Sequence, residues 1–291
     1  MQNLEEVQRA ADALRSLLGK QADFSTAEEG GPGHHAPVGI VLGTGLSSLA
    51  DMLRNRVSVP YGEIPGFPAS GVESHAGVFV WGRAPCGDGG GRSVLVQQGR
   101  CHLYEGRSPA DVCMGVRVLA AMGVKTLVLT NAAGALNPLF DVESIMCMTD
   151  IINHTGVSPL TGDNCPAWGP RFPDMSAPLD ARLRRLALET ATELGLRLER
   201  GVYIGVHGPE LETPAETRMY RQWGADAVGM SSVLEIIAAR HLGMAVLGLS
   251  CLTNKNLPDC MAPATLEQIC AAAQKTGENL ARLLCALVTK L

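Results

Sequence analysis

Apolar strands and amphipathic helices alternate along most of this chain, and this order constrains the fold more than any other feature of the sequence. The segments KTLVLT (125–130) and MAVLGLSCLT (244–253) are continuous apolar runs, typical of strands buried on both faces. Between such runs, apolar residues recur at helical spacing, as in 178–195 and 232–242. The alternation predicts an α/β protein with a mostly parallel sheet covered by helices on both faces.

The remaining segments extend this pattern without an internal repeat or a clear domain boundary. We therefore expect a single domain over 1–291, in which 1–37 form an N-terminal helix and a connector. The long Pro- and Gly-rich stretch 153–177 is expected to be functional, as a lid or a subunit contact. We expect further helices at 2–19, 109–122, 213–223 and from about 263, further strands at 38–45, 77–82, 93–99, 144–152, 201–206 and 225–230, and a hairpin loop at 88–91.

Charge and cysteine usage exclude several classes of protein. The net charge is −5 and no polybasic run occurs, which argues against a nucleic-acid partner. The nine cysteines are odd in number and irregularly spaced, so reduced thiols in the cytoplasm are expected rather than disulfides or a zinc site. The first residues lack a signal-peptide pattern, and no apolar run approaches the roughly 18 residues of a membrane span.

The strand at 125–130 leads into NAAGALNP (131–138), a segment with almost no side-chain bulk. Ligands of open α/β sheets bind beyond the carboxyl ends of the strands. Alanine and glycine at such a place let a ligand come close to the backbone. The segment therefore predicts a ligand site at this strand end.

Two further segments carry groups that suit an anion. GTGLSS presents backbone N–H groups and the Thr44 hydroxyl in a glycine turn; it also approaches a dinucleotide-binding fingerprint but lacks the third glycine. In QQGRCHLYEG, an extended backbone would place Arg100, His102 and Tyr104 on one face. A guanidinium binds phosphate through parallel hydrogen bonds, and a nearby imidazole adds a donor. His75, in ESHAG, is by itself more typical of a structural histidine.

Two other segments offer groups for a polar ligand. Glu212 comes directly before a helix expected to begin near Thr213, whereas Glu216 completes a capping box with Thr213 and is expected to be structural. Asn254, in TNKN, has an amide that both donates and accepts hydrogen bonds. Glu235 and Asp226 are also expected to be structural.

Seven segments, taken in order, resemble those of the trimeric (low-molecular-mass) purine nucleoside phosphorylases. They are GTGL, SHAG, QGRCHLYEG, TNAAGALNP, GPELETPAE, GADAVGMS and TNK, within 38–255. The resemblance implies a mixed, partly barrel-like central sheet flanked by helices, in a homotrimer with active sites near the subunit contacts. It implies a pentosyltransferase of purine salvage, which cleaves the N-glycosidic bond of 6-oxopurine (deoxy)ribonucleosides with phosphate, to free base and (deoxy)ribose 1-phosphate.

The resemblance also implies a role for individual residues of this sequence. No metal or cofactor is expected, because inorganic phosphate serves as the co-substrate. The expected partners are a purine nucleoside and phosphate, without nucleic acid or membrane. Asn254, Glu212 and His102 are the expected catalytic residues. The expected phosphate site comprises Thr44, His75, Arg100, His102, Ser231 and the backbone N–H of Ala132, and the expected nucleoside site comprises Tyr104 and Met230 at the ribose and Glu212, Asn254 and Val228 at the base.

Three positions on the sugar side depart from that family's pattern, and one departs in the phosphate site. An aromatic residue is usual where this chain has Leu211, and Val157 matches the position of an aromatic lent by a neighbouring subunit. Leu266 stands in place of a histidine that contacts the ribose 5′-hydroxyl. These changes make the sugar side more aliphatic and leave a 5′-modified nucleoside open as substrate. Thr44 replaces the commoner serine.

Three alternatives remain at this stage. A 5′-methylthioadenosine phosphorylase would carry aspartate in place of Asn254. A dinucleotide-dependent dehydrogenase would need the missing third glycine and an acidic residue about 20 positions further on. A non-catalytic nucleoside-binding protein would not need the combination of Arg100, Glu212 and Asn254.

Overall fold

The computed structural model describes residues 4–19, 22, 36–43, 46, 48–69, 71, 76–85 and 91–291. Most of the expected connector, the first residues of the expected hairpin loop, Thr44 and His75 lie outside the described residues. None of the described helices is long and apolar enough to cross a membrane.

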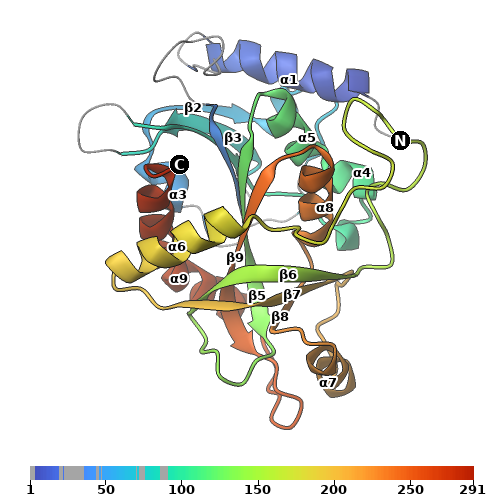
Figure 1. Cartoon of the computed structure of the whole chain (residues 1–291), viewed down its shortest axis with the longest axis vertical. Coiled ribbons are helices and arrows are strands. Elements are labelled where there is room, and N and C mark those ends of the chain that lie inside the picture. Colours follow the sequence, from blue (N-terminus) through green and yellow to red (C-terminus); the bar gives the residue numbers. More distant parts are fainter. Residues whose placement is uncertain are drawn as a thin grey trace.

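All strands of the described chain join in one sheet (Figure 1). They are β1 (Val38–Leu42), β2 (Arg54–Pro60), β3 (Val78–Arg83), β4 (Ser93–Gln98), β5 (Thr126–Ala135), β6 (Ile145–His154), β7 (Leu198–Val206), β8 (Ala227–Gly229) and β9 (Ala245–Lys255). Their order is β2-β3-β4-β1-β5-β8-β7-β6-β9, and β9 also pairs with β5. This last pairing closes β5, β8, β7, β6 and β9 into a five-stranded barrel.

The sheet is mixed, which confirms the mixed, partly barrel-like sheet implied by the resemblance, and parallel pairs outnumber antiparallel ones, as the alternation of strands and helices predicted. The pairs β1–β4, β1–β5, β5–β9, β6–β7 and β7–β8 are parallel. The pairs β2–β3, β3–β4, β5–β8 and β6–β9 are antiparallel. Alternation of strands and helices fixes the presence of crossovers, but not the direction in which each later strand joins the sheet.

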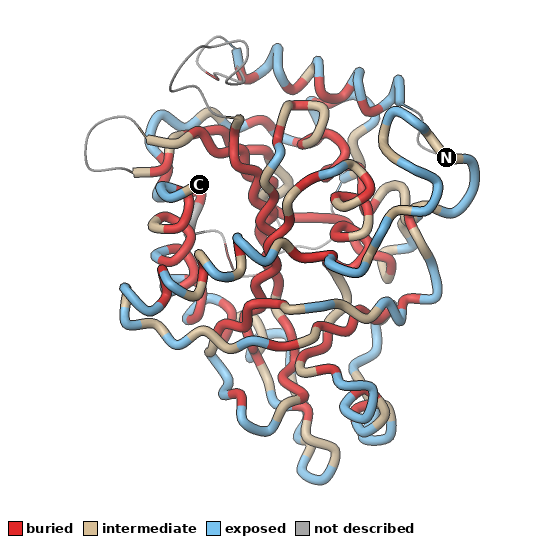
Figure 2. The backbone as a smooth tube through the Cα atoms, viewed as in Figure 1, coloured by how far each residue is buried: buried red, intermediate tan, exposed pale blue. Residues whose placement is uncertain are grey.

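Most of the helices cover the sheet in two groups, each with its own apolar core, while α7 (Pro214–Gln222) packs on a smaller third cluster. The other described α-helices are α1 (Leu4–Leu18), α3 (Ser48–Met52), α4 (Pro109–Val112), α5 (Met114–Ala121), α6 (Ala181–Glu193), α8 (Val233–His241) and α9 (Leu266–Val288). One core lies under α1, α5 and α8, and the other lies under α3, α6 and α9. Residues of β5 alternate between them: Leu127 and Leu129 enter the first core and Val128 enters the second. Figure 2 shows this burial concentrated along the strands.

Several boundaries differ from the sequence prediction for identifiable reasons. The edge strand β2 has no counterpart among the expected strands, because most of its residues are exposed and only Val57 and Val59 alternate with a polar residue. The helix expected over 109–122 is interrupted at Cys113, between α4 and α5. The strand expected over 125–130 continues to Ala135. Residues 155–180 carry no helix or strand, as expected for that long segment.

Candidate active site

The small residues of β5 lie beside a gap in the sheet. On one edge, β5 pairs with β1 over 126–129 and with β8 at Gly134 and Ala135, while β9 covers the other edge along its whole length. Residues 130–133 therefore have no strand partner on the first edge, and the sheet leaves their backbone polar groups there to other partners. The NAAG segment is thus part of a strand, rather than a turn after it, and its backbone is open to a ligand.

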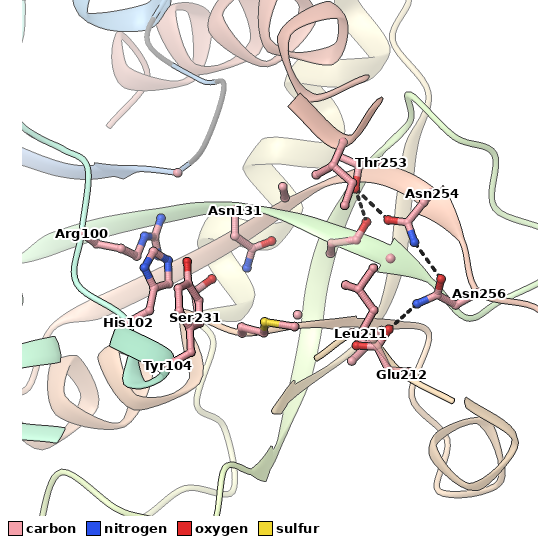
Figure 3. A pocket seen from close by; sticks show the side chains of 18 residues that line it. Arg100, His102, Tyr104, Asn131, Leu211, Glu212, Ser231, Thr253, Asn254 and Asn256 are labelled. Atoms are coloured by element: carbon pink, nitrogen blue, oxygen red, sulfur yellow. Dashed lines mark hydrogen bonds between the residues drawn. The ribbon is translucent and has the colours of Figure 1, made fainter. Parts of the chain in front are cut away.

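One pocket opens at this gap and collects residues from distant parts of the chain (Figure 3). All the predicted site residues that the structure describes line it: Arg100, His102, Tyr104, Ala132, Glu212, Val228, Met230, Ser231 and Asn254. Figure 3 shows Arg100, His102 and Ser231 at one end of the pocket and Glu212, Asn254 and Asn256 at the other. The pocket therefore has a cationic end and an end lined with amides and a carboxylate.

At the cationic end, Arg100 is held by a buried ion pair. Its Nη1 lies 2.7 Å from Glu235 Oε2, and both side chains are 1% exposed. The same Nη1 donates to Ser232 Oγ at 3.2 Å, and Nη2 donates to the carbonyl of Thr130, at the gap in the sheet. Glu235 occupies the first turn of α8, so this helix fixes the direction of the guanidinium. The expectation that Glu235 is structural is consistent with this position.

Ser232 joins α8 to the pocket floor in a strained conformation. Its φ is 65°, in the left-handed region that non-glycine residues seldom adopt. Such a residue destabilises a fold by about 1–3 kcal/mol unless its surroundings compensate. Here the backbone N–H of Ser232 donates to Glu235 Oε2 at 3.1 Å, and its hydroxyl accepts from Asn131 Nδ2 at 2.9 Å. These contacts hold the preceding Ser231 at the pocket wall.

His102 is oriented by Glu105, three residues further on. His102 Nδ1 lies 2.8 Å from Glu105 Oε1, and the ring stacks on Tyr104 with centroids 4.7 Å apart. Burial raises the pKa of Glu105, but hydrogen bonds from His102 and from the backbone of Gly71 outweigh it and leave the pKa below its ordinary value. An ionised Glu105 accepts a hydrogen bond from Nδ1–H, which fixes the orientation of the imidazole. The backbone is extended at His102 but turns into a 3₁₀ helix over 103–105, and Arg100, His102 and Tyr104 all line the pocket.

Tyr104 is a neutral donor on the same wall. Burial raises its pKa to about 12, and the charge of Glu105 adds to the effect. The phenol therefore keeps its proton at neutral pH and can donate it to a sugar hydroxyl.

At the other end, four side chains form a directed chain of hydrogen bonds. Thr253 Oγ1 donates to Asn254 Oδ1 at 3.0 Å, and Asn254 Nδ2 donates to Asn256 Oδ1 at 2.7 Å. Asn256 Nδ2 then donates to Glu212 Oε2 at 2.6 Å. Because an ionised carboxylate only accepts, Glu212 sets the direction of both amides in this chain.

Glu212 reaches this chain from the loop before α7. Thr213 caps that helix, Pro214 begins it, and Glu216 closes the capping box on Thr213 at 2.9 Å, as predicted. Burial raises the pKa of Glu212, and the charge of Glu216 raises it further, while the hydrogen bond from Asn256 opposes both. The protonation of the Glu212 carboxylate therefore depends on its burial and on the charged and polar groups around it.

The three departures lie at different places. Leu211 lines the pocket and is 46% exposed, whereas Leu266 and Val157 do not line it and are 67% and 36% exposed. Ile269, in the first turn of α9, lines the pocket instead. Phe172, in the same long segment as Val157, is an aromatic residue that is 86% exposed.

Sequence reasoning missed several lining residues. Asn131 and Thr253 lie within the segments that predicted the site, but neither residue type indicates a role there, and Ile269 follows no recognisable signal. Asn256 could have been found, because it lies two residues after Asn254, at the spacing that places side chains on one face of a strand. Among the described residues, no group of three or more His, Cys, Asp or Glu side chains could hold a metal ion.

Comparisons with known proteins agree with this architecture. The sequence profile described as "Phosphorylase superfamily" matches residues 37–289. Purine nucleoside phosphorylase 1 of Geobacillus stearothermophilus is 45% identical over 251 residues, which are 86% of this chain and 90% of that protein. The purine nucleoside phosphorylase of Rattus norvegicus is 42% identical over 282 residues, which are 93% of this chain and 91% of that protein.

Solved structures extend the similarity to the fold. The purine nucleoside phosphorylase of Schistosoma mansoni in complex with inosine has a TM-score of 0.87 and 32% identity, covering 99% of this chain and 97% of that one. The same enzyme in complex with adenosine has a TM-score of 0.86 and 33% identity, covering 99% and 98%.

Proposed function

This chain belongs to the phosphorylase superfamily, among the purine nucleoside phosphorylases, and we propose that it cleaves 6-oxopurine ribo- and deoxyribonucleosides with inorganic phosphate. The observation that carries this proposal is the two-ended pocket. It holds a buried arginine with a histidine and a serine at one end and a carboxylate with two amides at the other (Figure 3).

Phosphate binds at the cationic end. Arg100 supplies a fixed positive charge, the Ser231 hydroxyl and the backbone N–H of Ala132 supply neutral donors, and the imidazole of His102 lies at the same end of the pocket. Thr44 and His75 belong to the same proposed phosphate site by the resemblance. The start of α8 adds the positive end of a helix dipole.

The base binds at the opposite end, and the ribose lies between, beside Tyr104 and Met230. A 6-oxopurine offers an N1–H donor to ionised Glu212 and an N7 acceptor to Asn254, with Val228 on the pocket wall. Adenine presents an N1 lone pair, which a carboxylate repels.

The reaction then needs charge stabilisation and positioning, without a nucleophile from the protein. The C1′–N9 bond breaks with its electron pair leaving on the purine, and a phosphate oxygen forms the new bond to C1′. Bound phosphate is both the nucleophile and an anion beside the developing ribosyl cation. Asn254 and Glu212 stabilise the negative charge on the departing base.

Release of free base from a purine nucleoside panel, with and without phosphate, tests this function. We expect hypoxanthine and guanine from inosine and guanosine only when phosphate is present. Base release that does not depend on phosphate, or no release from any purine nucleoside, contradicts the proposal. As a control for a dinucleotide enzyme, NAD should not raise the melting temperature, whereas phosphate plus hypoxanthine should.

We also propose a single-domain, cytoplasmic homotrimer that acts in purine salvage. The eight described cysteines are free thiols, which is consistent with a reducing compartment. A subunit contact at the long segment would cover the Phe172 side chain, which is 86% exposed in the single chain. In such an assembly Phe172 is our candidate for the aromatic side chain that one subunit lends to the pocket of its neighbour, a role that Val157 cannot fill.

A 5′-modified nucleoside is the second candidate substrate. Leu211 and Ile269 place aliphatic side chains on the pocket wall, and Leu266 offers no partner to a 5′-hydroxyl. If this holds, 5′-deoxyinosine should be cleaved nearly as well as inosine. A penalty of about a hundredfold, roughly 2.7 kcal/mol, would mean that another group binds the hydroxyl.

A further inference from the structure

Asn256 occupies a position in the pocket that glycine makes possible. It follows β9, is 6% exposed, and its backbone N–H donates to the Ala135 carbonyl at 2.8 Å. A Cβ placed on Gly134 would lie 2.6 Å from Asn256 Nδ2 and 3.3 Å from Asn254 Nδ2. A larger residue at Gly134 would displace the amide of Asn256 and crowd that of Asn254, so the small β5 segment makes room for Asn256 as well as for a ligand.

The order of the polar groups matches the order of groups along a purine edge. In the protein, Asn256 lies between Glu212 and Asn254 and is hydrogen-bonded to both, at 2.6 Å and 2.7 Å (Figure 3). On a purine, the 6-substituent lies between N1 and N7. We propose that Asn256 is a specificity-determining residue that reads the 6-substituent of the base; this rests on the proposed placement of N1 at Glu212 and N7 at Asn254.

The hydrogen-bond chain fixes which polarity Asn256 presents. Its Oδ1 accepts from Asn254, and one hydrogen of its Nδ2 goes to the Glu212 carboxylate. Rotating the amide by half a turn would bring Oδ1 against that carboxylate, so the rotated state is unfavourable. Within the described residues, Nδ2 has no second acceptor. Its remaining hydrogen therefore suits the O6 acceptor of a 6-oxopurine and opposes the amino group of adenine.

A purely positioning role makes a different prediction. If Asn256 only held Glu212 and Asn254 in place, its removal would weaken all 6-oxopurine analogues that keep N1–H and N7 to the same extent. If Asn256 donates to O6, its removal should weaken inosine selectively. 6-Thioinosine separates the two roles, because it keeps N1–H and replaces O6 by sulfur, a weak acceptor.

The test is the ratio of kcat/KM for inosine to that for 6-thioinosine in wild type, Asn256→Leu and Asn256→Ala. Leucine has a shape similar to asparagine, and alanine guards against a folding defect of the leucine variant. Asn279→Leu, on the exposed face of α9, is the matched control. Loss of the donor should lower the inosine preference by about tenfold in both Asn256 variants and leave it unchanged in the control.

Two outcomes overturn the inference in different ways. A ratio that stays within about twofold of wild type in the Asn256 variants, whatever their absolute activity, means that Asn256 does not read O6. A second ratio checks this result independently of turnover. It compares the dissociation constants of hypoxanthine and 6-mercaptopurine, measured by calorimetry. If wild type binds neither base, the proposed function fails and this inference fails with it.

Discussion

Glu235→Gln tests whether the buried carboxylate holds the phosphate-binding arginine. The substitution keeps the shape of the side chain and removes its charge, so Arg100 is left buried without its ion partner. Glutamine is also accepted at this position of a capping box, so α8 keeps its start. The change therefore isolates the 2.7 Å ion pair from the helix cap.

The expected loss is large because both groups are almost fully buried. Removing one partner of a buried ion pair costs about 3–5 kcal/mol, and we take about 3 kcal/mol because the glutamine oxygen still accepts a hydrogen bond. For a chain of this size, 1 kcal/mol corresponds to roughly 2–4 °C in melting temperature, which gives a decrease of about 6–12 °C. Phosphate should restore part of this loss, because its charge replaces that of Glu235 beside Arg100.

The assay is thermal unfolding of wild type, Glu235→Gln and Glu216→Gln, each with and without phosphate. Glu216 is the matched control: it occupies the same capping-box position on α7 and pairs with Thr213 rather than with an arginine. We expect a large decrease only in Glu235→Gln and a larger stabilisation by phosphate there than in wild type. Equal decreases in both variants, or a phosphate effect no larger than in wild type, would refute the reasoning.

Three other substitutions probe the two ends of the pocket. Arg100→Ala should raise the phosphate KM by about 10- to 150-fold, from the loss of a charge-assisted pair worth about 1.5–3 kcal/mol; an unchanged KM and kcat would show that phosphate binds elsewhere. Hypoxanthine affinity should be full above the raised pKa of Glu212 and be lost as the pH falls through it, and Glu212→Gln should weaken binding and abolish this acid dependence; calorimetry across pH in both proteins decides. Asn254→Asp should raise the adenosine-to-inosine ratio of kcat/KM, and an unchanged ratio removes Asn254 from the base site.

The sequence predicted local features well at positions where the residue type suits only a few structural or chemical roles. The Thr213–Glu216 capping box forms as predicted, and residues of the glycine and alanine run after 130 line the pocket together with Arg100 and Asn254, although β5 continues through that run. These features depend on neighbours within a few residues, so the sequence carries them directly.

Features that depend on distant partners could not be derived in this way. The pairing of β5 with β9 closes the barrel, and the separate pairing of β5 with β1 and β8 leaves the gap that becomes the pocket. No local pattern encodes either arrangement. For the same reason Glu235 could be assigned to its helix but not to Arg100, and Asn256 could not be linked to Glu212, 44 residues away.

The most direct test of the central claim is the fate of the sugar. Inosine is incubated with the enzyme and phosphate labelled with ¹⁸O, and hypoxanthine, ribose 1-phosphate and free ribose are quantified together. Phosphorolysis predicts one ribose 1-phosphate for each hypoxanthine, with labelled oxygen in the bond to C1′. Free ribose in place of ribose 1-phosphate would show hydrolysis and contradict the account.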